Sequence, residues 1–412
     1  MAKKTVADID VKGKKILMRC DFNVPLDDKQ NITSDDRIVK ALPTIKAVLS
    51  GGGALILMSH LGRPKGEPDP KFSLEPVARR LSERLGKNVI FANDCIGEDV
   101  KKKVAALEAG DVMLLENVRF HKEETIKDKA AKEDAQLRAA KDNFAKEIAA
   151  LGDVYVDDAF GTAHRDNASM YTVPMMMESK PRVIGFLIEK ELKFLGETVS
   201  NPDKPFVAIL GGAKVSDKIG VIENLMNKVD TILIGGAMAY TFFKAQGFKI
   251  GKSLCEDDFL DKATALLEQA KKLDCEIVLP EDSVVAREIK PGAEHKNVLK
   301  DIEDDWLGLD IGPKTCRLFA EKLEGAKTIV WNGPMGVFET PPFDEGTKAV
   351  ARAVAAATDA GARSVVGGGD SASALNKLGL ADRISHISTG GGASLEFLEG
   401  KKFVCIEILD EK

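Results

Sequence analysis

The sequence predicts an α/β protein with two doubly wound parallel-sheet domains. Its 412 residues exceed what one hydrophobic core usually holds, so about two domains are expected. Short apolar, β-branched runs alternate with helical patterns along both halves, which is typical of parallel strands connected by helices. The loops after these runs carry cations before residue 170 and glycines after residue 205. We therefore expect two Rossmann-like domains that bind different ligands.

The predicted strands are short and spread along the whole chain. In the first half they are expected at residues 16–18, 55–58, 89–91, 112–115 and 154–156. In the second half they are expected at residues 206–210, 232–234, 277–279, 329–331 and 365–366.

One amphipathic helix is expected to connect the two domains. Ile188, Leu192, Leu195 and Val199 recur at i, i+4, i+7 and i+11, which predicts a helix over residues 186–199 that ends at Asn201-Pro202. The predicted division is therefore a first domain over residues 1–185, a connecting helix over 186–200 and a second domain over 201–392.

Residues 121–150 are densely charged. Leu137, Phe144, Ile148 and Leu151 nevertheless keep helical spacing, so we interpret this segment as a solvated surface helix and attach no function to it.

Composition excludes several classes of protein. A formal net charge of −6 argues against general binding of nucleic acid, which usually needs a basic stripe. No stretch approaches the length of a membrane span, and the charged N-terminal residues do not resemble a targeting signal. The 6 cysteines are scattered without metal-ligand spacing, so neither a zinc site nor a disulfide framework is expected. We expect a soluble, cytoplasmic protein.

The cationic loops of the first half predict an anion site. Ligands of open α/β sheets bind beyond the carboxyl ends of the strands, where these loops lie. Arginine forks bind phosphate and carboxylate, and short polar side chains can bind a hydroxyl. The ligand expected is a small phosphorylated hydroxy acid. An isolated arginine is more often a surface ion-pair partner, and an isolated histidine a structural residue. The candidates are Arg37, His60, Arg63, Arg119 and Arg165 for the anion, and Asp21 and Asn23 for a hydroxyl.

The glycine-rich loops of the second half predict a nucleotide site of another kind. No P-loop motif is present, and no dinucleotide fingerprint stands in the right context. In GGAKVSDK, Lys214 and Lys218 are expected on one face of the first helical turns, which suits a polyphosphate. Asp370 could hold Mg²⁺ together with nucleotide phosphates, or it could cap the following helix. Glu339 could accept hydrogen bonds from ribose hydroxyls.

Eight strings in order resemble the phosphoglycerate kinase family over essentially the whole chain. These are RCDFNVP, SHLGRP, ENVRF, DAFGTAHR, GGAKVSDK, WNGPMGVFE, GGGDS and TGGGAS. The resemblance implies that 3-phosphoglycerate binds to the first domain at Asp21, Asn23, Arg37, His60, Arg63, Arg119 and Arg165. It implies that MgATP or MgADP binds to the second domain at Gly212, Lys214, Lys218, Gly236, Gly312, Asn332, Glu339, Gly368, Gly369, Asp370 and Ser371, with Asp370 at the metal.

The same resemblance implies a catalytic arrangement. Arg37, Lys214 and Lys218 would flank the transferring phosphoryl group, and the helix N-terminus at Gly391 and Gly392 would stabilise its charge. The implied reaction gives 1,3-bisphosphoglycerate and ADP across a hinged cleft, in a monomer that needs neither nucleic acid nor membrane. Residues 393–412 would return to the first domain.

The chain departs from the family in one string. Where the family usually reads AHRAH, this chain has Asp166 and Asn167 after Arg165, so a second histidine is missing. Two other functions stay open at this point: a kinase of similar fold that acts on another phosphorylated acid, and an inactive nucleotide-binding scaffold. An inactive scaffold would be expected to lack Lys218, Asp370 or Arg37, and all three are present.

Overall fold

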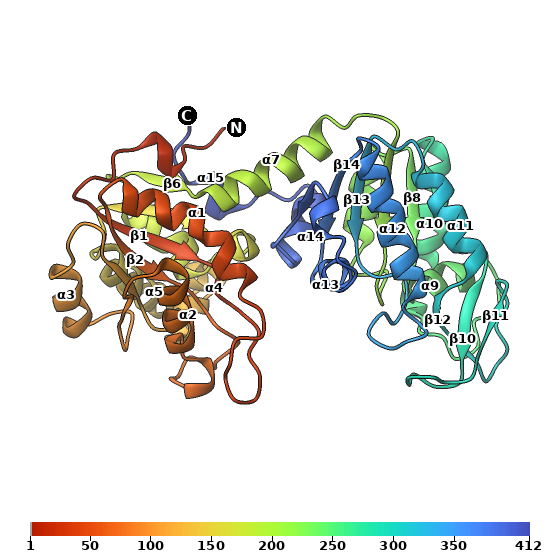
Figure 1. Cartoon of the computed structure of the whole chain (residues 1–412), viewed down its shortest axis with the longest axis horizontal. Coiled ribbons are helices and arrows are strands. Elements are labelled where there is room, and N and C mark those ends of the chain that lie inside the picture. Colours follow the sequence, from red (N-terminus) through yellow and green to blue (C-terminus); the bar gives the residue numbers. More distant parts are fainter. Residues whose placement is uncertain (1) are drawn as a thin grey trace. The chain divides into compact units, whose positions relative to one another are not determined.

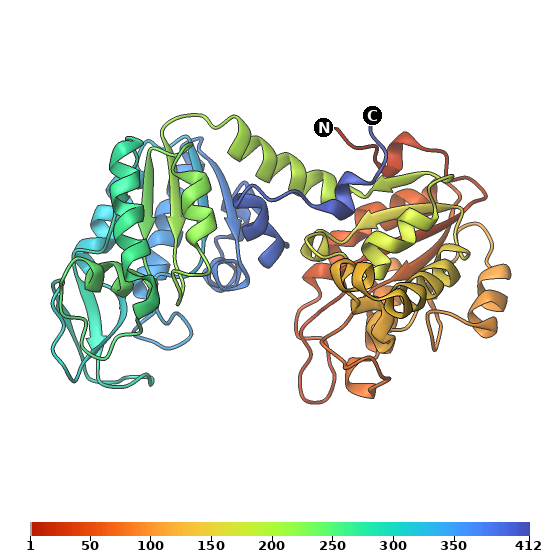
Figure 2. The same ribbon diagram turned by 180° about the vertical axis from the view of Figure 1, so that it is seen from behind.

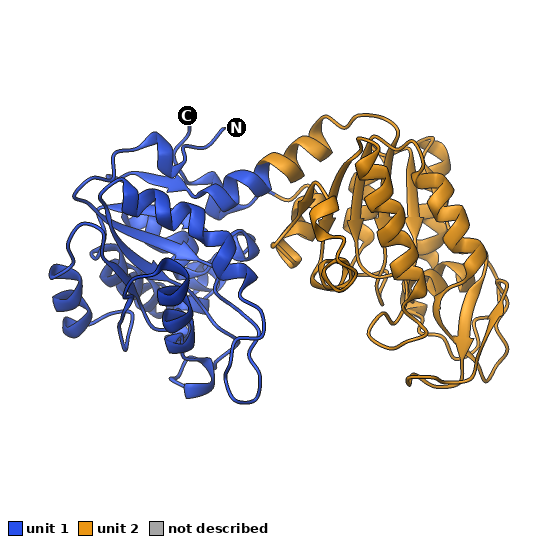
Figure 3. Cartoon of the chain, viewed as in Figure 1, with its two compact units in different colours: residues 1–192, 402–412 blue, residues 193–401 orange. Residues whose placement is uncertain are grey.

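The computed structural model describes residues 2–412, and the chain forms two compact units (Figure 3). Unit 1 contains Met1–Leu192 together with Lys402–Lys412, and unit 2 contains Lys193–Lys401. Each unit is built on its own six-stranded parallel sheet, so the prediction of two parallel α/β domains is confirmed.

The sheet of unit 1 has the strand order β3-β4-β2-β1-β5-β6, with every pair parallel. The chain runs from β1 outward to one edge and then returns to β5 on the other side of β1, so the switch in direction lies at the centre. The strands are β1 Lys15–Cys20, β2 Ala54–Met58, β3 Ile90–Phe91, β4 Val112–Leu114, β5 Val154–Asp158 and β6 Arg182–Ile184.

Helices cover both faces of this sheet (Figures 1 and 2). Ile16 and Met18 of β1 pack in one core cluster with apolar residues of α1 and α2, whereas Leu17 and Arg19 point to the opposite face because strand side chains alternate. The helices are α1 Asp36–Ser50, α2 Glu75–Leu85, α3 Glu98–Ala105, α4 Asp128–Glu133, α5 Ala135–Ala149, α6 Val173–Met176 and α15 Val404–Glu407. Short helical turns are η1 Val6–Asp8, η2 Pro70–Phe72, η3 Val118–Phe120, η4 Lys122–Thr125, η5 Phe160–Thr162 and the π-helix η6 Ala168–Thr172.

The charged segment 121–150 contains η4, α4 and α5. Phe144 and Ile148 are buried on α5, as their spacing predicts, while Leu137 is exposed. Lys141 departs from the expected solvated surface, because its side chain is fully buried and its ammonium lies 3.1 Å from Asp128 Oδ1.

The sheet of unit 2 has the order β15-β14-β13-β7-β8-β9, again entirely parallel. The direction changes between β7 and β13, the two central strands. The strands are β7 Phe206–Leu210, β8 Thr231–Ile234, β9 Glu276–Val278, β13 Thr328–Asn332, β14 Arg363–Gly367 and β15 His386–Ile387. The helices are α8 Ile219–Leu225, α9 Met238–Ala245, α10 Leu260–Lys272, α11 Pro313–Leu323, α12 Glu345–Asp359, α13 Gly369–Lys377 and α14 Gly392–Leu398, with short turns η7 Asp257–Phe259 and η8 Ala381–Arg383.

Unit 2 also has a three-stranded antiparallel sheet that we did not predict. Its order is β11-β10-β12, with β10 Ser283–Ala286, β11 His295–Val298 and β12 Leu307–Ile311. The sequence HKNV of β11 is mostly polar and half exposed, so it lacks the apolar signature of a buried strand.

The connecting helix is α7, Phe186–Ser200, and the division between the units falls inside it. The C-terminal boundary lies later than expected, because residues 393–401 belong to unit 2 and only Lys402–Lys412 cluster with unit 1. The Leu398 carbonyl of α14 accepts a hydrogen bond of 2.6 Å from Asn224 Nδ2, which ties this helix to the second unit.

The two ends of the described chain lie side by side in unit 1 (Figures 1 and 2), where Lys3 pairs with Glu411 in an antiparallel bridge. No helix within residues 2–412 is long and apolar enough to cross a membrane.

Candidate active site

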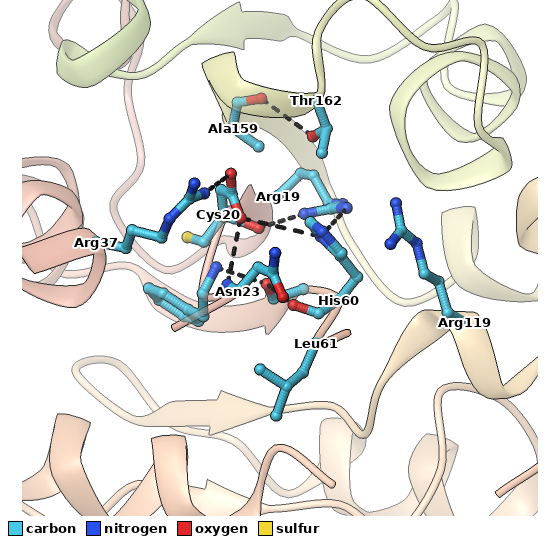
Figure 4. Close-up of polar contacts among 12 residues, drawn as sticks. Arg19, Cys20, Asn23, Arg37, His60, Leu61, Arg119, Ala159 and Thr162 are labelled. Atoms are coloured by element: carbon cyan, nitrogen blue, oxygen red, sulfur yellow. Dashed lines mark hydrogen bonds and ion pairs between the residues drawn. The ribbon is translucent and has the colours of Figure 1, made fainter. Parts of the chain in front are cut away.

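The predicted anion-binding residues of unit 1 lie at the edge of its sheet that is formed by the carboxyl ends of the strands. Parallel strands all end at the same edge, and the polar loops after β1, β2, β4 and β5 meet there. Figure 4 shows side chains from these loops together with Arg37, which stands in the first turn of α1.

Asp21 and Arg37 form an ion pair at the centre of this edge. Arg37 Nη1 donates to Asp21 Oδ2. Asp35 is engaged elsewhere, 3.3 Å from Arg80 Nη1 and 2.7 Å from Arg84 Nη2. Burial opposes ionisation of Asp21, but the neighbouring cations outweigh it and hold its pKa below the ordinary value. The alternative that Arg37 merely pairs with Asp35 or Asp36 on the helix surface is therefore wrong.

Asn23 and Arg119 hold the SHLGRP loop between them. Asn23 Oδ1 accepts a hydrogen bond of 2.8 Å from the Gly62 N–H, and Arg119 Nη1 donates at 2.7 Å to the Gly62 carbonyl. Arg119 Nε is buried without a hydrogen-bond partner in the described chain, and burial lowers the pKa of this guanidinium to about 10. An unpaired buried donor on a cation is costly unless a ligand accepts from it, so Arg119 is suited to an anion.

The two remaining arginines are more accessible. Arg63 is exposed in the loop after β2 and forms no ion pair or hydrogen bond with residues 2–412. Arg165 is half-buried after β5, and its Nε donates at 3.0 Å to His164 Nε2.

His60 is buried beside Arg19, which was not among the candidate site residues of our sequence analysis. Arg19 is fully buried near the end of β1, and its Nη2 lies 3.3 Å from His60 Nδ1. The sequence does contain a signal for Arg19, because a charged side chain inside an apolar strand is rarely buried without partners. Burial lowers the pKa of His60 well below its ordinary value, and the charge of Asp21 opposes this effect.

The structure also shows the surroundings of Asp166 and Asn167, the two residues that depart from the family string. Asn167 is buried and its Nδ2 donates at 3.2 Å to Glu124 Oε1. Asp166 Oδ2 accepts at 2.7 Å from the backbone N–H of Asp128 at the start of α4, and Lys127 lies 3.4 Å from its other oxygen. The added acid is therefore compensated by a backbone N–H and a lysine ammonium at the start of α4.

Two cavities of unit 2 contain most of the predicted nucleotide residues. They have volumes of about 570 and 240 Å³ and share Gly212 and Asp370 in their lining. The larger is also lined by Lys214, Lys218, Asn332, Gly368, Gly369, Gly391 and Gly392, and the smaller by Gly236 and Glu339.

Lys214 and Lys218 do not lie in a helix as predicted. α8 begins only at Ile219, and a turn closed by the Lys218 N–H on the Val215 carbonyl at 2.9 Å precedes it. Lys214 is exposed, whereas Lys218 is buried and donates to Asn332 Oδ1. Burial lowers the pKa of Lys218 to about 8, with three nearby acids acting against it. Asn332 Nδ2 is buried without a partner in the described chain.

The predicted glycines divide into two groups. Gly236 has φ +69°, and a Cβ there would lie 2.5 Å from the backbone of Gly212. Only glycine therefore allows the loops that carry Gly236 and Gly212 to approach each other. Gly312 lines neither cavity, and a Cβ there would lie 2.3 Å from the Asp282 carboxylate. Ser371 also lines neither cavity, because its Oγ is buried and accepts a hydrogen bond of 2.9 Å from the Gly333 N–H.

Asp370 has the features of a magnesium ligand. Its exposed carboxylate faces both cavities and forms no hydrogen bond or ion pair with residues 2–412. The residue that caps α13 is Gly368, so the alternative that Asp370 is the helix cap is wrong. One free carboxylate beside these glycine-lined cavities fits Mg²⁺, which is commonly held by one or two carboxylates, substrate phosphates and water.

Comparison with known proteins agrees across the chain. The phosphoglycerate kinase family matches residues 6–401. The chain is 54% identical over 412 residues to a phosphoglycerate kinase of Chlorobium limicola, covering 100% of both chains. It is 56% identical over 414 residues to one of Thermosipho africanus, covering 100% of this chain and 99% of the relative.

Solved structures of phosphoglycerate kinases are similar as well. That from Coxiella burnetii has a TM-score of 0.84 and 42% identity, and that from Pyrococcus horikoshii has 0.82 and 32%, each with 98% of both chains covered. These matches extend over both units and all eight sequence strings, and the chain therefore belongs to the phosphoglycerate kinase family.

Proposed function

We propose that this chain reversibly transfers the γ-phosphoryl group of ATP to the carboxylate of 3-phosphoglycerate, giving 1,3-bisphosphoglycerate and ADP. The observation that supports this most directly is the pair of anion sites at the carboxyl ends of two separate sheets. One presents arginines, with Arg119 Nε unpaired, and the other presents Lys218 and glycine backbone beside Asn332. Full-length relatives named phosphoglycerate kinase support the same reaction.

Unit 1 is proposed to bind the phosphorylated acid. Its arginines would donate paired hydrogen bonds to the phosphate and the carboxylate, and the polar side chains would bind the hydroxyl group. The residues proposed are Asp21, Asn23, Arg37, His60, Arg63, Arg119 and Arg165.

Unit 2 is proposed to bind the nucleotide with Mg²⁺. Asp370 would hold the metal, which supplies positive charge at the phosphates. Gly312 and Ser371 would act by shaping the loops, since neither lines the two cavities described above. The residues proposed for direct contact are Gly212, Lys214, Lys218, Gly236, Asn332, Glu339, Gly368 and Gly369.

Transfer would need no general base, because the accepting carboxylate is already ionised at neutral pH. Arg37, Lys214 and Lys218 would neutralise the charge on the transferring group, and the backbone N–H groups at Gly391 and Gly392 would add to this. Because the two sites belong to different units, the units would have to close on each other for each turnover, which would also exclude water. The free cysteines suit a reducing cytoplasm.

Turnover of ATP with and without 3-phosphoglycerate tests this function. We expect ATP consumption only when 3-phosphoglycerate is present, with far lower rates for other phosphorylated acids in a panel. A better acceptor in that panel would favour another small-molecule kinase. Absence of turnover with tight nucleotide binding would favour an inactive scaffold.

A further inference from the structure

Arg19 differs from the other arginines of unit 1 because its guanidinium is held on three sides. Its Nε donates at 2.9 Å to Ser169 Oγ, its Nη1 donates to the Cys20 carbonyl, and its Nη2 contacts His60 Nδ1 at 3.3 Å. The side chain is fully buried, so it acts on a ligand only through another residue. Figure 4 shows its guanidinium beside the His60 ring.

The buried carboxylate of Glu124 completes this arrangement. Ser169 Oγ has one hydrogen, and because the oxygen accepts from Arg19, that hydrogen goes to Glu124 Oε1 at 2.7 Å. Glu124 Oε2 accepts at 2.8 Å from the Ser169 N–H, which fixes the carboxylate. Glu124 and Ser169 are both fully buried, and the negative charge compensates the buried guanidinium.

The direction of these hydrogen bonds determines the tautomer of His60. A guanidinium has donors only, so His60 Nδ1 must accept from Arg19 and the ring hydrogen must sit on Nε2. Asp21 Oδ1 lies 4.0 Å from Nδ1, too far to hold a hydrogen there. Burial lowers the pKa of the ring, and Arg19, Arg119 and Arg37 lower it further against the opposing charge of Asp21, so the ring stays neutral. His60 Nε2 forms no hydrogen bond within residues 2–412, and this atom is not buried, so a ligand can reach it.

We propose that Glu124, acting through Ser169 and Arg19, holds His60 as the neutral Nε2–H tautomer, so that His60 offers one fixed N–H donor to an anionic oxygen of the phosphorylated acid. Glu124, Ser169 and Arg19 are thus positioning residues. The ligand part rests on the proposed function, whereas the tautomer does not. Glu124 also gives the start of the charged segment 121–150 a role.

The tautomer is tested on the full chain without substrate. In protein labelled with ¹⁵N-histidine, long-range ¹H–¹⁵N NMR spectra distinguish a protonated from an unprotonated ring nitrogen, and His60→Gln identifies the signal. We expect His60 to show Nδ1 unprotonated and Nε2 protonated from pH 6 to 8, without titration. In Ser169→Ala the two nitrogens should average between tautomers.

Two matched variants control for packing. Ser169→Thr keeps the hydroxyl and should keep the parental signal. Thr172→Val removes another buried hydroxyl of η6, one that has no hydrogen-bond partner in the described chain, and should change nothing. A His60 protonated on Nδ1, or a Ser169→Ala spectrum identical to the parent, overturns the tautomer assignment.

Kinetics test the ligand part separately. Ser169→Ala should raise KM for 3-phosphoglycerate about tenfold, the scale of one charge-assisted hydrogen bond, while kcat changes less than about twofold. An altered tautomer with a parental KM would refute the role of His60 as a donor to the acid. If 3-phosphoglycerate is not a substrate at all, the proposed function fails while the NMR result still decides the tautomer.

Discussion

The pKa of Lys218 predicts how the reaction depends on pH. Burial lowers this pKa to about 8, against the charges of Asp217, Asp370 and Glu399. Only the ammonium form can neutralise phosphoryl oxygens, so activity should be present below pH 8 and lost as pH rises through it. The pH dependence of kcat/KM reports groups of the free enzyme, which is the state described by this structure.

The size of the effect follows from the titration. With a pKa of about 8, the charged fraction is roughly 0.9 at pH 7 and roughly 0.1 at pH 9, so kcat/KM for MgATP should fall about tenfold over this range. An unburied lysine would titrate near pH 10.4 and would leave the profile flat over the same interval. Initial rates at saturating 3-phosphoglycerate and low MgATP measure the profile.

Substitutions assign the titration to one residue. Lys218→Arg keeps a charge that does not titrate, so the fall above pH 8 should disappear even though the rate is lower. Lys214→Ala removes the exposed neighbouring lysine and should lower the rate while the fall remains. Lys218→Ala should lose roughly 10²-fold or more in kcat with little change in nucleotide Kd. The assignment is refuted if Lys218→Arg keeps the parental profile.

Three further predictions concern both sites and the start of α7. Arg37→Ala should lose roughly 10²-fold or more in kcat with unchanged affinity for MgATP, and Arg37→Lys should recover only part; near-parental rates in both variants would make Arg37 dispensable for catalysis. Asp370→Ala should weaken the binding of MgADP much more than the binding of metal-free ADP, as measured by calorimetry, whereas equal losses of affinity would exclude a role in metal binding. Burial raises the pKa of Asp158 to about 7, and its Oδ1 accepts from the N–H groups of Leu187 and Ile188 at the start of α7. Its folded pKa therefore lies above its unfolded value, so the free energy of unfolding should fall as pH rises from about 4 to 7. Urea unfolding of Asp158→Asn should show a shallower fall, and an unchanged slope would count against this assignment.

Secondary structure could be predicted well from the sequence because local patterns report it. The central strands are buried on both faces, so each appears as an apolar run, and the spacing of Ile188, Leu195 and Val199 reports the buried side of α7. Patterns were weaker where burial is partial. The polar strand β11 and the turn before α8 were missed for this reason, because neither has an apolar period of its own.

The strings that identify the family also located the candidate site, because ligand loops follow strands whose positions were predictable. What the sequence alone could not determine is which side chains meet there. Arg37 pairs with Asp21 across 16 positions rather than with its neighbours Asp35 or Asp36. Arg19, Ser169 and Glu124 come from three separate segments, and no local spacing relates them.

Burial distinguishes the features that residue order could predict from those that required the folded chain. Residue types and their order determined the fold class, the strand ends and the kind of ligand, because these depend on neighbours along the chain. The unpaired donors of Arg119 and Asn332, the lowered pKa of Lys218 and the tautomer of His60 depend on distant residues that exclude water and fix hydrogen-bond directions. Water exclusion is a property of the packed unit, and it exists only after the chain has folded.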